Sequence, residues 1–167
     1  MLRKRQPLAA TIGNVTMAQM TKTDVLKFMQ THALAVQSSV SSLGEPQSAV
    51  IGFVVNDDFH MFFDTMDATR KAKNLRRNPM ISFVIGGLIK GDERTVQYNG
   101  IADEPKGKEL DSLKELYFTR FPDGRERQNW KGLIYIRAKP IWIRYSDFNQ
   151  APAEILEFAF GKKANGG

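Results

Sequence analysis

The sequence contains no cysteine among its 167 residues and has only two histidines, His32 and His60. A chain without cysteine can form neither a disulfide framework nor a thiolate metal site, so we expect a cytoplasmic protein. The two histidines lie in different predicted elements, and neither has a second ligand at the spacing found in zinc or iron sites. We therefore expect no bound metal.

Long apolar runs and the common catalytic motifs are also missing. No stretch approaches the roughly 18 apolar residues that a membrane-spanning helix needs, and no apolar segment follows the basic start Met1–Arg5 as it would in a secretory signal. The chain has no Gly-x-Ser-x-Gly elbow, no Gly-x-Gly-x-x-Gly fingerprint and no P-loop. If the protein is an enzyme, we expect an organic cofactor to carry the reaction.

Composition and charge describe a globular protein with a preference for anionic partners. Apolar residues make up 42% of the chain and charged residues 25%. The length suits one domain, which we place at 21–160, after an N-terminal arm over 1–20 and before a flexible tail over 161–167. Lys and Arg number 24 against 18 Asp and Glu, a net charge of +6. Such an excess suits small phosphorylated molecules or nucleic acid.

Short strands dominate the predicted secondary structure. Thr21 and Asp24 form a capping-box pattern, which predicts an amphipathic helix over 22–31. Another helix is predicted to start at 103–105, where leucines and aromatic residues then recur at three and four residues. The short connections favour antiparallel pairing and a small barrel with helical decoration. The predicted strands span 33–40, 47–55, 59–64, 80–85, 94–102, 133–137, 141–145 and 155–160.

The segment Phe62–Pro79 combines an apolar strand, a polar turn and a basic helix, which we predict over 68–77. Asp67 is the expected N-cap of this helix. Pro79 is expected to end it, because proline disfavours helical backbone in the residue before it. Five of the eight residues from 70 to 77 are basic.

The start of this basic helix has the chemistry of a phosphate site. Thr65 and Thr69 offer hydroxyls, Arg70 and Lys71 offer positive charge, and the backbone N–H groups of a first helical turn have no partner within the helix. We therefore predict a cradle for a small phosphorylated ligand. A solvated helix face and a nucleic-acid-binding patch remain the alternatives.

The chain resembles the pyridoxamine 5′-phosphate oxidase-like family of flavin-binding split β-barrels over roughly residues 22–148. The most specific part is 62–79, with its Thr, a four-residue step to Thr-Arg-Lys, and an Asn-Leu-x-x-Asn-Pro helix end. The segments 44–47, 93–96 and 142–147 agree as well. The resemblance implies a mainly β fold with α, a split β-barrel of about six to seven antiparallel strands decorated by three short helices.

The resemblance also implies a homodimer with FMN bound at the interface between two barrels. Thr69, Arg70 and Lys71 are then expected to bind the FMN phosphate through charge-assisted hydrogen bonds. Asp64 and Thr65 are expected along the ribityl chain or the ring edge. The other implied cofactor contacts are Ser48, Ala49, Val50 and Ile51 on the second strand, Thr95, which stands where the family often has an amide, and Trp142, which could equally be core or interface packing.

Departures from the family pattern concern the substrate, whose expected contacts are Phe53, Tyr117 and Arg120. Pyridoxamine-phosphate oxidases carry a basic residue where this chain has Phe53, and an Arg-x-His where it has Arg144-Tyr145-Ser146. We therefore expect a small-molecule substrate other than pyridoxamine phosphate, handled by a flavin reductase or an oxidase-like enzyme. No side chain is an obvious general acid, so we expect water or a polar group such as Tyr117 to exchange protons. The alternatives are an F420- or haem-binding protein of the same fold and a non-catalytic nucleic-acid-binding barrel.

Overall fold

The structure, a computed structural model, describes residues 20–161. The predicted arm and tail fall almost wholly outside this range. The described part begins with the predicted amphipathic helix, whose capping box is confirmed, since Thr21 Oγ1 accepts from the Asp24 amide and the Asp24 carboxylate accepts from the Thr21 amide. The helices are α1 (Lys22–Thr31), α2 (Arg70–Arg77), α3 (Gly107–Arg120) and α4 (Gly124–Arg127), and the strands are β1 (Leu34–Val40), β2 (Pro46–Gly52), β3 (Val54–Val55), β4 (Met61–Met66), β5 (Met80–Gly86), β6 (Arg94–Asp103), β7 (Leu133–Asp147) and β8 (Glu154–Ala159).

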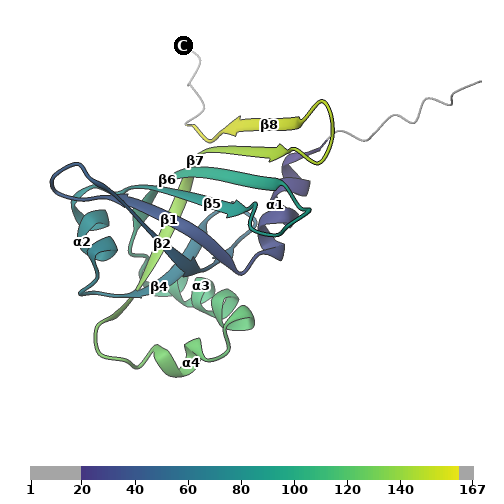
Figure 1. The fold of residues 1–167 in the computed structure, drawn as a ribbon. Helices are drawn as coiled ribbons and strands as arrows, with labels where there is room; N and C mark the ends of the chain where they lie inside the picture. Colours follow the sequence, from purple (N-terminus) through teal and green to yellow (C-terminus); the bar gives the residue numbers. More distant parts are fainter. Residues whose placement is uncertain (1–19, 162–167) are drawn as a thin grey trace, which may run out of the picture.

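The strands form one antiparallel sheet in the order β2-β1-β5-β6-β7-β4-β3, with β8 added beside β7. The sheet curls until β2 lies close to β4 without pairing with it, as Figure 1 shows. This arrangement confirms the predicted split barrel. Helix α4, a single turn after α3, was not predicted from the sequence.

Residues 133–137 and 141–145, predicted as two strands, form the single strand β7. Pro140 lies inside it, and the register with β6 shifts beside this proline. Asn99 pairs with Trp142 and Gly100 pairs with Pro140, so Ile141 is an extra residue on β7. Proline donates no hydrogen bond, so a bulge is the usual place for it within a sheet. The unbroken β7 pairs with β6 along most of its length and also reaches β4 at one end and β8 at the other.

The predicted strand 47–55 is divided at Phe53 into β2 and β3, because the chain changes partners there. Strand β2 pairs with β1, whereas β3 pairs with β4. Phe53 keeps a backbone bond to Ala33 and buries its ring completely in the barrel. Helix α3 begins at Gly107 and not at 103–105, because Asp103 still belongs to β6, where its carboxylate pairs with Arg137.

Two apolar clusters lie on opposite sides of the sheet. The larger one fills the barrel and includes the fully buried Phe63, Phe83 and Tyr98. The smaller one packs α3 against β4 through Phe62 and Tyr117. Alternate residues of β4 therefore point into different environments, a consequence of the two-residue period of a strand.

Gly100 is required for the close passage of β6 over β7. A Cβ at this position would lie 2.5 Å from the carbonyl oxygen of Lys139 and 2.7 Å from the ring of Tyr98. We predict that Gly100→Ala lowers the free energy of unfolding by about 1–3 kcal/mol, the usual cost of forcing extra atoms into a packed core. Urea unfolding measures this, and Gly161→Ala, where nothing lies within 4 Å, is the control. Equal midpoints for both variants would show that the passage can relax.

Candidate anion-binding site

Helix α2 begins at Arg70, and its N-cap is Thr69 rather than the predicted Asp67. Thr69 Oγ1 accepts a hydrogen bond from the Ala72 amide at 3.3 Å and lies 3.3 Å from Thr65 Oγ1. The prediction of Asp67 as the cap was wrong because the Asp67 carboxylate forms an ion pair with Arg76, in the last turn of the same helix. The first turn of α2 therefore carries no acidic residue.

The amino end of α2 opens onto a pocket of about 180 Å³ between the helix and strands β1 and β2. This pocket brings together five of the residues predicted from the sequence to bind cofactor: Ser48, Ala49, Thr69, Arg70 and Lys71. Gln37, Ser39 and Gln47 complete its lining. Free amide groups and the helix dipole both favour an anion at this end of a helix.

Buried polar contacts hold α2 in place over the two strands. Asn74 Nδ2 donates to Ser39 Oγ on β1 at 3.1 Å and to Gln47 Oε1 on β2 at 3.0 Å. Arg77 Nη2 donates to Asn74 Oδ1 at 3.3 Å and to the Val40 carbonyl at 3.1 Å. Because Asn74 is almost completely buried, these bonds are protected from water and fix where the first turn of the helix lies.

Gln37 was not predicted as a site residue. Its side chain is 1% exposed, and its Nε2 is buried without a hydrogen-bond partner within the described part of the chain. It shares the inward face of β1 with Ala35 and Ser39. The available signal was a long polar residue at an inward position of the strand, two residues from the inward Ala35.

Other predicted cofactor residues lie away from this pocket. Ile51 is buried in the barrel core, and Val50 is 63% exposed on the opposite face of β2. Thr95 and Trp142 are partly exposed on β6 and β7, on the side of those strands opposite the buried Val96 and Ile143. Thr65 contacts the pocket only through Thr69.

Asp64 and Thr65 lie on opposite faces of β4. The Asp64 carboxylate accepts from the Tyr117 hydroxyl at 3.0 Å and from Arg127 Nη2 at 3.0 Å, on the side covered by α3 and α4. Burial, followed by the adjacent Asp64 charge, raises the pKa of Tyr117 far above its ordinary value. Tyr117 is 2% exposed, so its hydroxyl serves this contact and is poorly placed to exchange a proton with a ligand.

The predicted substrate residues are not brought together. Phe53 belongs to the barrel core, and Tyr117 belongs to the cluster under α3. Arg120 lies at the surface, where its guanidinium donates to the Gln30 carbonyl on α1. The family resemblance predicted that these three residues line the substrate side of the site. In the structure, each lies in a different environment.

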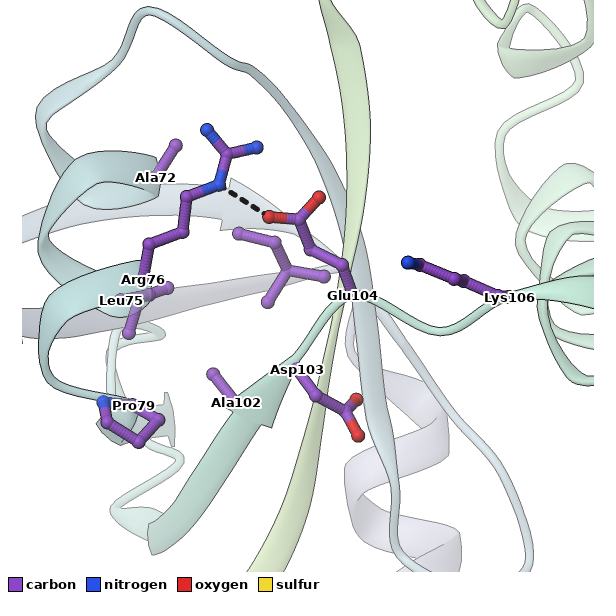
Figure 2. Close-up of a pocket in the computed structure, with 9 residues that line it drawn as sticks. Ala72, Leu75, Arg76, Pro79, Ala102, Asp103, Glu104 and Lys106 are labelled. Carbon is purple, nitrogen blue, oxygen red and sulfur yellow. Dashed lines mark hydrogen bonds and ion pairs between the residues drawn. The ribbon is translucent and has the colours of Figure 1, made fainter.

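A wider pocket of about 470 Å³ lies between α2 and the end of β6 (Figure 2). Its apolar residues include Leu75, Pro79 and Ala102, and the hydrogen bond from Arg76 Nε to Glu104 Oε1, at 2.6 Å, spans it. Arg76 also pairs with Asp67. Since this guanidinium is already shared by two carboxylates, the pocket has less free positive charge for an anion than the pocket at the start of α2.

Within residues 20–161, no group of three His, Cys, Asp or Glu side chains is arranged to hold a metal ion. Burial, and then the positive charge of Arg137, lowers the pKa of His60, which is half-buried. No helix in the same range has the length and hydrophobicity needed to cross a membrane.

Comparison with protein families assigns most of the described chain to one family. The family described as pyridoxamine 5′-phosphate oxidase matches residues 21–146, about three quarters of the chain. The chain belongs to the pyridoxamine 5′-phosphate oxidase family. The resemblance seen in the sequence is thereby confirmed. No curated protein matches the sequence.

Solved structures similar to this member of the pyridoxamine 5′-phosphate oxidase family support the same fold. A heme-binding protein from Mycobacterium smegmatis has a TM-score of 0.67 and 11% identity, over 80% of this chain and 56% of its own. A heme storage protein from Vibrio cholerae has a TM-score of 0.62 and 17% identity, over 71% and 89%. An F420 reductase has a TM-score of 0.53 and 13% identity, over 70% and 93%. This chain thus spans little more than half the length of the Mycobacterium smegmatis protein.

Proposed function

We propose that the protein is an FMN-binding oxidoreductase whose substrate is not pyridoxamine phosphate. The observation that carries the proposal is the pocket at the start of α2, where Thr69, Arg70 and Lys71 lie beside Ser48 and Ala49 of β2. These residues come from two segments of the chain that the family resemblance independently assigns to cofactor binding. A phosphate group suits the pocket because it matches the charge and the hydrogen-bond donors found there.

The two cations in this pocket are available for a ligand. Neither Arg70 nor Lys71 forms an ion pair in the described structure, whereas Arg76 on the same helix pairs with two carboxylates. The pocket volume of about 180 Å³ is below the roughly 300–1,000 Å³ of sites that enclose a whole ligand. We therefore assign it to the phosphate end of the cofactor, with the ring outside it.

The outer face of the sheet is the proposed surface for a second copy of the chain. Val50 pairs with Val36 and Val36 pairs with Val84, so three valines form a row across β2, β1 and β5 on this face. Leu34, Met80 and Ile101 extend the apolar surface, and each is about half exposed in the single chain. A polar row of Ser48, Ser38, Ser82 and Asn99 separates the valines from Met80 and Ile101. Exposed apolar side chains gathered on one face with a few polar groups are typical of an interface. Covering it in a homodimer would also enclose a ring that extends beyond the phosphate pocket.

The flavin, when bound, supplies the hydride transfer. The residues of this chain bind its phosphate through Arg70 and Lys71 and exclude water with the apolar face around Val50. The two positions that carry basic residues in pyridoxamine-phosphate oxidases are closed in this fold, since Phe53 is fully buried and Ser146 is 2% exposed. A dianionic substrate phosphate has no charged partner at either position.

Removing the two pocket cations should release the cofactor. We predict that Arg70→Ala combined with Lys71→Ala weakens FMN binding more than about 100-fold, since each charged hydrogen bond contributes about 1.5–3 kcal/mol. Isothermal titration calorimetry measures the change. The double variant Lys73→Ala and Lys90→Ala removes equal charge outside the pocket and should bind FMN normally.

Equal FMN affinity in the two double variants would refute the phosphate assignment. If the protein is instead a nucleic-acid-binding barrel, both double variants should bind DNA or RNA more weakly, and this binding should depend steeply on salt concentration. The absorption spectrum of the purified protein separates the remaining alternatives, because oxidised flavin, deazaflavin and haem absorb differently.

The apolar face should hold two chains together. We predict that Val84→Glu shifts a homodimer toward monomer and lowers FMN affinity, because a charge in the centre of this face must lose its hydration on association. Sedimentation velocity at micromolar concentration measures the assembly. Leu43→Glu, in the turn between β1 and β2, is the control at an exposed leucine outside the face. A wild-type monomer under these conditions contradicts the proposed interface.

Pyridoxamine 5′-phosphate should be a poor reductant of the bound flavin. The expected rate of flavin bleaching is negligible, because Phe53 and Ser146 offer no charged contact to the substrate phosphate. Stopped-flow absorption with pyridoxamine 5′-phosphate as sole reductant measures this rate, and a nicotinamide donor is the comparison. Rapid bleaching followed by release of pyridoxal phosphate would show that the substitutions do not restrict the substrate.

A further inference from the structure

The side chain of Gln37 is an unmet polar group in the wall of the pocket at the start of α2. It projects from the middle of β1, where its residue pairs with Ala49 on β2 and Phe83 on β5. It is 1% exposed, and its amide nitrogen Nε2 is buried without a hydrogen-bond partner among residues 20–161. Leucine has nearly the same size and could fill this position without leaving a polar group unpaired.

The neighbouring polar groups do not share this deficit. Asn74 donates to both Ser39 and Gln47. Thr69 Oγ1 accepts a hydrogen bond from the Ala72 amide. A buried amide without a partner opposes folding, and native proteins rarely retain one without a reason. Because Gln37 lines the same pocket as Arg70 and Lys71, its missing partner is best sought in a ligand that reaches those cations.

We propose that Gln37 is a specificity-determining residue, which recognises hydroxyl groups on the chain attached to the ligand phosphate. A side-chain amide both donates and accepts hydrogen bonds. A hydroxyl group can accept from the amide N–H and donate to the amide oxygen, whereas an ionised phosphate or carboxylate can only accept. Arg70 and Lys71 already supply donors for the phosphate. The ligand class is therefore a phosphate monoester of a polyhydroxylated chain. This inference rests on the proposed function, for which the chain is the ribityl group of FMN.

Two ligands that differ only in their hydroxyl groups test this role. Ribitol 5-phosphate and n-pentyl phosphate share the phosphate and the five-carbon chain, and calorimetry compares their affinities for the full-length protein. We expect the wild type to prefer ribitol 5-phosphate by about tenfold, which corresponds to one buried hydrogen bond. Gln37→Leu should remove this preference. The Arg70→Ala and Lys71→Ala double variant should bind both ligands more weakly and leave the ratio of their affinities unchanged.

A second readout separates recognition from a purely structural role. Without ligand, Gln37→Leu should raise the melting temperature, because the variant no longer buries an unpaired amide. A structural role for Gln37 predicts a lower melting temperature and an unchanged ligand ratio. FMN binding by the wild type is measured in parallel. If the wild type does not bind FMN, the proposed cofactor is refuted, but the comparison of ribitol 5-phosphate with n-pentyl phosphate stays valid. Equal affinity of the wild type for the two phosphates would overturn the inference.

Discussion

The buried hydrogen bonds of Asn74 hold the candidate site together. A helix amino terminus attracts anions wherever it lies, but it forms a site only when other groups face it at a fixed distance. Asn74 ties one turn of α2 to Ser39 on β1 and Gln47 on β2, so that Thr69, Arg70 and Lys71 face the same two strands. The pocket exists, and its cations lie beside Gln37, because this contact holds α2 against the two strands.

The barrel provides the support for that contact. Strands β1 and β2 belong to one end of a curled sheet, and β4, which leads into α2, belongs to the other end. The long strand β7 bridges the sheet by pairing with β6 and with β4, and its bulge at Ile141, next to Pro140, allows it to bend without losing its continuity. The amino end of α2 therefore faces β2 across the split of the barrel, where the described strands β2 and β4 do not pair.

Two adjacent residues of strand β4, Asp64 and Thr65, have different roles because they lie on opposite faces of the strand. Thr65 lies beside Thr69 at the pocket, while Asp64 lies on the other face, where it holds Tyr117 and Arg127. Both residues had been predicted along the cofactor. The Asp64 contacts anchor α3 and α4 to the sheet, and they explain why Tyr117, a plausible proton donor from the sequence, is buried in a structural cluster.

The sequence alone determined the features that depend on neighbours along the chain. These include the family, the succession of antiparallel strands, the capping box at Thr21 and the basic helix ended by Asn78-Pro79. The tertiary structure alone decided which residues share a space. It placed Gln37 in the pocket and sent Phe53, Tyr117 and Arg120 to separate environments. The physical reason is that capping and turn preferences act over a few residues, whereas burial and pocket lining depend on strand partners and helix packing far away in the sequence.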